Sequence, residues 1–458
     1  GSVVGVGGLG GLVRKCGTLS NLPGCPPFDP MALEGAPIVQ VAIEPADLTA
    51  LPSLEHALRR LDMSDPAVET GCLPTGEHVL KCCGEVHLER CLHDITTTFA
   101  PGIQLHISPP LVPYRETAAP GGDGAACAST ATRHARLTVR AASLPPAAAA
   151  VLRAHAGVLY DAAQRGRSWL ASRLPPPLAS AISELQAGLA GSGLGCAWAG
   201  ARPVGMGSGD AAGTLLLCGC SAAEQLAAAA AAPAASGLAG AASSFVLASL
   251  ISGFELGVAR GPLCDEPVSE TVFLVEEVGW AEEGAAGGAD VAALPGQLIS
   301  AMREACRAAF LDCGTRLLEP VYRCEVQCDR ESLGRMYAVL RRRRGEVVAE
   351  ALDDGTHLFH ITATLPVVES FGFAHDLRKS TSGAAHPQLV FSHFQALAQD
   401  PRFVVLTEEQ QEALDDGDLP TINLAKKLVD DVRRRKGLRV EDKVVASATK
   451  QRTISRKR

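Results

Sequence analysis

The chain has 458 residues, of which 47% are hydrophobic, 4% aromatic and 20% charged, and its formal net charge is −8. This length exceeds what one hydrophobic core serves and predicts roughly three or four domains. The 15 cysteines are odd in number and no signal peptide leads the sequence, which argues against an extracellular disulfide framework and favours reduced thiols inside a cell.

The first residues contain a glycine pattern of the dinucleotide-binding type. Gly5, Gly7 and Gly10 have the G-x-G-x-x-G spacing, which in a strand-turn-helix unit lets the backbone approach a pyrophosphate. The stretch that follows is too rich in Gly and Pro for the required helix, and the acidic residue expected roughly 20 positions later is missing. We therefore predict strand ends and turns here, and not a nicotinamide-dependent oxidoreductase.

Residues 36–108 alternate between strand and helix periodicity in the order strand, helix, strand, strand, helix, strand. The first strand reads PIVQVAIEP, and the helix LPSLEHALRRLDMSD places its leucines on one face. The second helix, EVHLERCLHDITTTFA, carries an apolar stripe from Leu88 to Ile95. This order is the split ferredoxin-like motif.

The same order returns in residues 319–392, which predicts a second ferredoxin-like domain. The region between the two domains, residues 109–318, combines low-complexity Pro/Gly-rich stretches with strands around GPLCDEPVSETVFLVEEV and the helix GQLISAMREACRAAFLDCG. Two ferredoxin-like domains are thus predicted to flank a mixed α/β region.

The longest uncharged run lies between Glu224 and Glu255 and is long enough for a membrane span. Half of it is Ala, Gly and Ser, it is interrupted by Pro233, and only Phe245 to Ile251 is strongly apolar. We predict an Ala-rich linker that runs into a short core helix, and no membrane segment.

Catalytic and metal-binding patterns are absent from the sequence. It contains no G-x-x-x-x-G-K-[ST], H-E-x-x-H or G-x-S-x-G, and no C-x-x-C pair that would indicate zinc. Glu85, His87 and Glu89 alternate along a helix and therefore point apart, while His357 and His360 fall on opposite faces of a strand. We predict neither a catalytic nor a metal-binding residue.

Positive charge is concentrated in the last part of the chain, a predicted basic helical tail over residues 393–458. From Lys426 onward, 13 Lys and Arg face four Asp and Glu, so this segment carries +9 and the remainder −17. Such a helix is either a solvated surface or a phosphate-binding element. The candidate RNA-binding residues of the tail are Lys426, Lys427, Arg433, Arg434, Arg435, Lys436 and Arg439.

A second basic run, Arg341, Arg342, Arg343 and Arg344, ends a predicted helix. Cations at a helix C-terminus complement the helix dipole, and the same side chains could bind phosphates. Both interpretations stay open, and the four arginines are further candidates for contact with the phosphates of a nucleic acid.

Four segments resemble translational GTPases of the elongation factor two and elongation factor G family. They are GEHVLKCCGEVHLERCLHDI, PPLVPYRET, ISGFELGVARGPLCDEPV and ESFGFAHDLRKSTSGAAHPQLVFSHF, in order along the chain. The opening stretch, VVGVGGLGGLVRKCGTL, resembles the last strands of the second domain of that family, a β-barrel, so residues 1–35 are identified with its end.

Two features separate the branches of this family. Translocases carry a histidine, modified to diphthamide, in the loop before a helix of the fourth domain, and the corresponding stretch EEVGWAEEGAAGGADVAALPGQLIS has none. The end of the chain, VRRRKGLRVEDKVVASATKQRTISRKR, is similar instead to elongation factor-like GTPases that mature the large ribosomal subunit. An elongation factor two type translocase is the alternative.

The resemblance implies an α+β multidomain protein. Two ferredoxin-like (split βαβ) domains would flank an S5-like α/β domain, with a β-barrel remnant at the N-terminus and the basic tail at the C-terminus. It further implies a cytoplasmic factor with no membrane partner. Its partners would be the large (60S) ribosomal subunit and its rRNA, the Shwachman-Bodian-Diamond syndrome protein, and the anti-association initiation factor six that it releases.

The nucleotide chemistry of the family belongs to a G domain whose phosphate-binding motif this sequence lacks. The resemblance therefore implies the C-terminal, effector part of a GTP hydrolase, with no cofactor bound by this chain and GTP with Mg²⁺ bound by the full-length protein. No catalytic residue of the family can therefore be assigned to a position in this chain. A non-enzymatic ribosome-binding scaffold that lacks a G domain stays open as an alternative.

Overall fold

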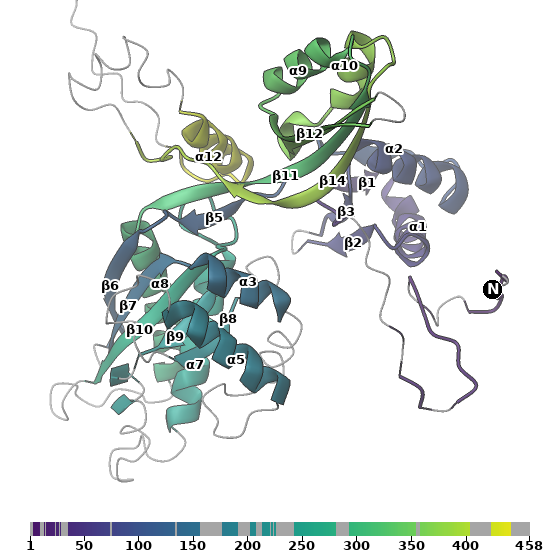
Figure 1. Cartoon of the computed structure of the whole chain (residues 1–458). Helices are drawn as coiled ribbons and strands as arrows, with labels where there is room; N and C mark the ends of the chain where they lie inside the picture. The colour runs from purple at the N-terminus through teal and green to yellow at the C-terminus, as the bar shows by residue number, and fades with distance from the viewer. Residues whose placement is uncertain are drawn as a thin grey trace, which may run out of the picture. The chain divides into compact units, whose positions relative to one another are not determined.

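The computed structural model describes most of residues 3–28, residues 35–155 except 74, 75, 133 and 134, residues 176–190, 202–207 and 213–225 except 220 and 223, residues 242–280, residues 293–403 except 354–357, and residues 423–440 (Figure 1). The chain forms two compact units. Unit 1 comprises Gly1–Arg115 and Leu318–Ala396, and unit 2 comprises Glu116–Leu317 and Leu397–Arg458.

The described residues before position 35 form neither strand nor helix, so the strand ends predicted there are not seen. Val3 and Val4 are fully or largely exposed. Gly8 and Gly24 do adopt positive φ values of 82° and 80°, as the predicted turns require. Gly10 of the glycine pattern lies outside the described residues.

The first ferredoxin-like domain belongs to unit 1. Its elements are β1 (Val39–Pro45), α1 (Leu51–Ser64), β2 (Glu69–Cys72), β3 (His78–Cys82), α2 (Glu85–Asp94), which continues as a π-helical turn (Ile95–Phe99), and β4 (Leu105–Ile107). The antiparallel sheet has the order β2-β3-β1-β4. The leucine face of α1 and the stripe of α2 are buried against this sheet, as their spacing predicts.

The second ferredoxin-like domain also lies in unit 1. Its elements are β11 (Thr315–Cys328), whose first residues lie in unit 2, α9 (Leu333–Arg342), β12 (Glu346–Leu352), β13 (Phe359–Pro366), α10 (Phe373–Ser380) and β14 (His386–Ala396). The sheet order β12-β13-β11-β14 repeats that of the first domain. The last strand continues to Ala396, which pairs with Leu318, four residues beyond the predicted domain boundary at residue 392.

The two ferredoxin-like domains share one apolar cluster within unit 1. Tyr322 and Val367 are buried in the core that β1 and α1 line, and the Tyr322 hydroxyl donates a 2.7 Å hydrogen bond to the carbonyl of Cys83. The Gly372 N–H, at the start of α10, donates to the Glu85 carboxylate at 2.8 Å. These two hydrogen bonds set the position at which the apolar surfaces of the two ferredoxin-like domains pack together.

Unit 2 is built on a five-stranded sheet of order β6-β7-β10-β9-β8. Its elements are β5 (Arg115–Ala118), β6 (Asp123–Ser129), β7 (Ala135–Ser143), α3 (Pro146–Ala154), α5 (Pro176–Ala190), β8 (Arg202–Met206), β9 (Leu215–Cys218), α7 (Ala242–Ala259), β10 (Thr271–Trp280), α8 (Leu294–Asp312) and α12 (Leu424–Arg435). Arg115, the first residue of β5, belongs to unit 1.

Helices cover both faces of this sheet. Phe273 and Val275 of β10 pack into the core formed with α7 and α8, whereas Val272 and Leu274 pack into the core formed with α3 and α5. Successive residues of a strand point to opposite faces, so β10 is buried on both sides. This double burial explains why TVFLV reads as an unbroken apolar run.

The apolar part of the long uncharged run is a buried core helix, α7, which begins at Ala242 and is longer than the sequence indicated. Within the described part of the chain, no helix combines the length and apolar character needed to cross a membrane. Gly253 and Gly257 face α8, and a Cβ at Gly253 would lie 2.6 Å from the Ile299 carbonyl oxygen and 2.8 Å from the Met302 Cβ. These glycines permit the close approach of the two helices.

We expect Gly253→Ala to destabilise unit 2 by about 1–3 kcal/mol, because the added methyl group overlaps the α8 backbone. Gly257→Ala is the matched control. Its nearest neighbour, the Cys306 Cβ, lies 3.3 Å away, and the helix propensity gained by alanine, up to about 1 kcal/mol, offsets the tighter contact. All three tryptophans lie within Glu116–Leu317, so fluorescence-detected urea unfolding reports this unit. Equal effects of the two substitutions would show that the close approach of α7 and α8 does not depend on Gly253.

Candidate nucleic-acid interface

The basic helix α12 begins with two side-chain caps. The Asn423 Oδ1 accepts a hydrogen bond from the Lys426 N–H at 3.0 Å, and the Gln399 Oε1 accepts one from the Leu424 N–H at 2.7 Å. Both caps satisfy N–H groups that the first turn of a helix leaves without a partner. Ala425, Val429 and Val432 form the buried stripe of the helix, so the opposite face points to solvent.

The other end of α12 is held by a loop at residues 261–266. Arg433 donates to the Leu263 carbonyl oxygen at 2.5 Å and also to the Arg439 carbonyl, which turns the following residues back on the helix. Lys436 donates to the Asp265 carbonyl and pairs with the Glu266 carboxylate at 3.0 Å. Two of the predicted RNA-binding residues are therefore anchors within unit 2.

The loop is itself organised by a buried carboxylate. Glu116 Oε2 accepts from the Leu263 N–H at 2.9 Å, and Oε1 accepts from the N–H groups of Cys264 at 2.8 Å and Glu266 at 3.2 Å. Burial raises the pKa of Glu116 to about 7, and the three donors act in the opposite direction. A Cβ at Gly261 would lie 2.2 Å from Oε2, so only glycine fits there.

The remaining cations of the segment form an exposed basic face. Lys427, Arg434, Arg435 and Arg439 are exposed, and Lys426 is half-buried. Arg434 pairs with Asp431 at 2.9 Å, and Arg435 donates to the Asp431 carbonyl at 3.3 Å. Guanidinium and ammonium groups held on a fixed helix can neutralise phosphates, which is the chemistry that this face supports.

The second basic run divides into exposed and internally bonded residues. Arg341 and Arg342, in the last turn of α9, are exposed. Arg343 donates to the carbonyls of Glu369 and Phe371 at 2.6 and 2.7 Å and pairs with Asp376 at 2.5 Å. This guanidinium is the main reason that the pKa of Asp376 is lowered.

Arg344 has a positive φ of 59° and pairs with the buried Glu319 at 2.5 Å. Arg343 and Arg344 therefore support the second ferredoxin-like domain, and only Arg341 and Arg342 present their charge outward. The run belongs to unit 1, whereas α12 belongs to unit 2.

One constellation in the first ferredoxin-like domain was not predicted from the sequence. Asp65, His87 and Cys91 each offer a ligand atom, and the three atoms lie within 4.8 Å of one another. The spacing between His87 and Cys91, four residues on a predicted helix, was the available signal. The alternation of Glu85, His87 and Glu89 along the helix does not indicate this cluster, because these three side chains point apart. Of the strand pair also considered, His360 lies on β13 and His357 falls outside the described residues.

Comparisons with known proteins identify both ferredoxin-like domains. Residues 35–107 match the family model for Elongation Factor G, domain III, and residues 316–404 match that for Elongation factor G C-terminus. The whole chain aligns with Elongation factor-like GTPase 1 of Mus musculus at 34% identity and of Homo sapiens at 32%, covering 48% of each. It aligns with Ribosome assembly protein 1 of Saccharomyces cerevisiae at 34%, covering 42% of that protein.

The chain is thus homologous over its whole length to elongation factor-like GTPases and ribosome assembly proteins, which confirms the resemblance drawn from the sequence. It spans about half the length of the curated relatives it matches.

Glu116→Gln tests the role of the buried carboxylate. Between the ordinary pKa of 4.5 and about 7, folded Glu116 holds a proton that the unfolded chain has released, so its contribution to the free energy of unfolding falls as pH rises, by at most about 3 kcal/mol. Glutamine does not titrate. The stability advantage of wild type over the variant should therefore shrink from about pH 5 to about pH 8. An advantage that grows with pH would show that the loop N–H groups stabilise the anion.

Arg342 and Arg343 are neighbours with different surroundings, so substituting each in turn distinguishes an arginine that stabilises the fold from one that presents its charge to solvent. We expect Arg343→Ala to destabilise the second ferredoxin-like domain by about 2–3 kcal/mol, because its charged hydrogen bonds to two carbonyls and Asp376 are removed. The exposed Arg342→Ala is the control and should change stability by less than about 0.5 kcal/mol. Thermal unfolding followed by circular dichroism measures both, and equal melting temperatures would refute the assignment of Arg343.

Proposed function

We propose that this chain is the effector arm of a ribosome-associated GTPase that promotes maturation of the large ribosomal subunit, and that the exposed face of α12 binds rRNA. Homology over the whole chain to elongation factor-like GTPases and ribosome assembly proteins supports a role in ribosome maturation. The observation that carries the RNA contact is the basic face of α12, which protrudes from a helix anchored at both ends.

The distribution of charge favours RNA as the ligand of this face. The segment from Lys426 onward, which begins within α12, carries +9 on a chain whose remainder carries −17, so attraction to a polyanion is concentrated in this segment. Each phosphate that Lys or Arg neutralises releases counterions, which supplies binding free energy without sequence specificity. A maturation factor that recognises a large folded RNA by its backbone needs this kind of contact.

We expect the nucleotide to bind outside these 458 residues. They contain no G-x-x-x-x-G-K-[ST], so GTP and Mg²⁺ would bind elsewhere in the full-length protein. GTP would favour one arrangement of the effector domains over another, and hydrolysis would release that bias. The expected outcome, in the cytoplasm and with the Shwachman-Bodian-Diamond syndrome protein, is release of the anti-association initiation factor six.

The remaining parts of the chain also have expected roles. Unit 2, with its mixed sheet between two helical layers, takes the role of the S5-like fourth domain of the family. Residues 1–35 would complete a β-barrel in the full-length protein. The region from 276 to 300 contains no histidine that could become diphthamide, which favours subunit maturation over translocation.

We predict that replacing the four exposed cations Lys427, Arg434, Arg435 and Arg439 with alanine weakens binding of the chain to purified large ribosomal subunits. The slope of log affinity against log salt concentration should become shallower by about one for each phosphate that the variant no longer neutralises. Affinities measured at several salt concentrations give this slope directly.

A charge-matched control replaces four exposed arginines of unit 1: Arg59, Arg90, Arg323 and Arg330. It changes the net charge by the same amount and should leave the salt slope as in wild type. If both variants alter the slope equally, net charge and not the α12 face governs binding. If neither does, the RNA contact is refuted.

A further inference from the structure

A cluster of metal-ligating side chains joins the two helices of the first ferredoxin-like domain. Asp65 directly follows the last residue of α1, His87 lies in the first turn of α2, and Cys91 lies one turn further on. One ligand atom from each lies within 4.8 Å of the other two. Among the residues that the structure describes, this is the one such group of three.

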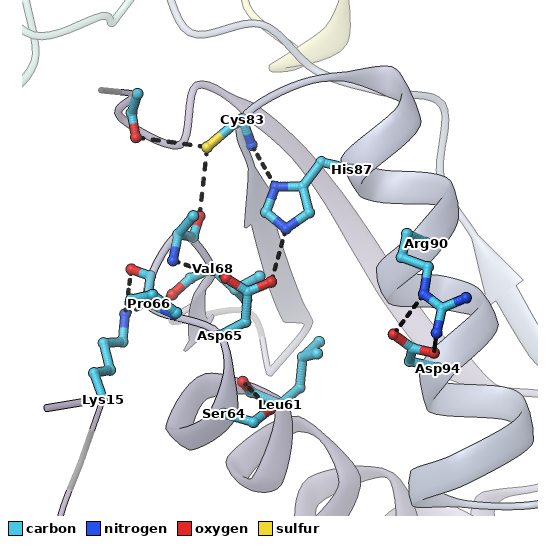
Figure 2. A network of polar contacts seen from close by, with 12 residues as sticks. Lys15, Leu61, Ser64, Asp65, Pro66, Val68, Cys83, His87, Arg90 and Asp94 are labelled. Atoms are coloured by element: carbon cyan, nitrogen blue, oxygen red, sulfur yellow. Dashed lines mark hydrogen bonds and ion pairs between the residues drawn. The ribbon is translucent and has the colours of Figure 1, made fainter. Parts of the chain in front are cut away.

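Figure 2 shows how the imidazole of His87 is held between Asp65 and the backbone of Cys83. The Cys83 N–H donates to Nδ1 at 3.2 Å, and Nε2 lies 2.9 Å from the Asp65 Oδ2. Because Nδ1 accepts, the proton of the neutral ring is on Nε2 and is shared with the carboxylate. A proton thus occupies the position between nitrogen and oxygen that a cation could take.

The third member supplies a sulfur ligand. Cys91 is 2% exposed, whereas the side chains of Asp65 and His87 are 32% and 22% exposed, so the group opens to solvent on the carboxylate and imidazole side. Zinc binds the thiolate form of cysteine, and binding of the cation favours loss of the thiol proton.

We propose that Asp65, His87 and Cys91 bind one zinc ion. A thiolate, an imidazole and a carboxylate are the three kinds of ligand that zinc accepts in tetrahedral sites, and water from the exposed side would complete the fourth position. Magnesium and calcium prefer oxygen ligands and do not suit this set.

Zinc binding has a defined proton balance. The cation takes the Nε2 lone pair and the Cys91 sulfur, the ring proton moves to Nδ1, and the thiol proton is released to solvent. The Cys83 N–H then loses its acceptor, and this bond is long at 3.2 Å. The ion links the end of α1 to the first two turns of α2 and thereby braces the domain.

Cobalt(II) is the probe that reports the ligands. The full chain, stripped with a chelator, should bind one equivalent of Co²⁺ with a sulfur-to-cobalt charge-transfer band, and Zn²⁺ should displace the cobalt. Zinc should also raise the melting temperature of the wild-type chain, because it binds the folded state selectively. Absence of cobalt binding, or binding without the sulfur band, overturns the proposal with the wild-type protein alone.

Three variants test which residues are ligands. Cys91→Ala should abolish the charge-transfer band and the zinc-dependent rise in melting temperature. Asp65→Asn, at a partly exposed position, should weaken binding about 10- to 100-fold. Cys72→Ala removes an exposed thiol on β2 and should behave as wild type. A band that survives in folded Cys91→Ala, or that disappears in Cys72→Ala, assigns the metal to other sulfurs and refutes the site.

Discussion

The carboxylate of Glu116 is the interaction on which the arrangement of unit 2 around its basic helix depends. It is fully enclosed and receives three backbone N–H groups from one short loop, and the absence of a side chain at Gly261 lets it reach them. The loop carbonyls then point outward, where Arg433 and Lys436 bind them. A single buried acid thus converts part of the backbone into an acceptor surface for α12.

Two of the segments that resemble translational GTPases meet at this point. PPLVPYRET supplies Glu116, and ISGFELGVARGPLCDEPV supplies both the glycines that bring α7 close to α8 and the loop that surrounds the carboxylate. Their residue types follow from close packing and from the pairing of buried polar groups. The same construction leaves outward-facing cations on α12, which links the packing of unit 2 to its proposed contact with RNA.

The order of elements in both ferredoxin-like domains could be predicted from the sequence because each strand and helix has one buried face with its own period. The different roles of the arginines at the end of α9 could not be predicted from the sequence. Arg342 and Arg343 are adjacent and chemically identical, and only the tertiary position of the Glu369 and Phe371 carbonyls separates them. The cluster of His87 with Asp65 was likewise out of reach, since the two residues lie on different elements.

Hydrogen–deuterium exchange of α12 in wild type and Glu116→Gln tests the central claim most directly. If the carboxylate sets the loop that holds the helix, the amides of Leu424–Arg435 should exchange faster in the variant, while those of α8, which does not contact the loop through these bonds, keep their protection. Unchanged exchange in α12 would show that its position does not depend on Glu116 and would contradict the account.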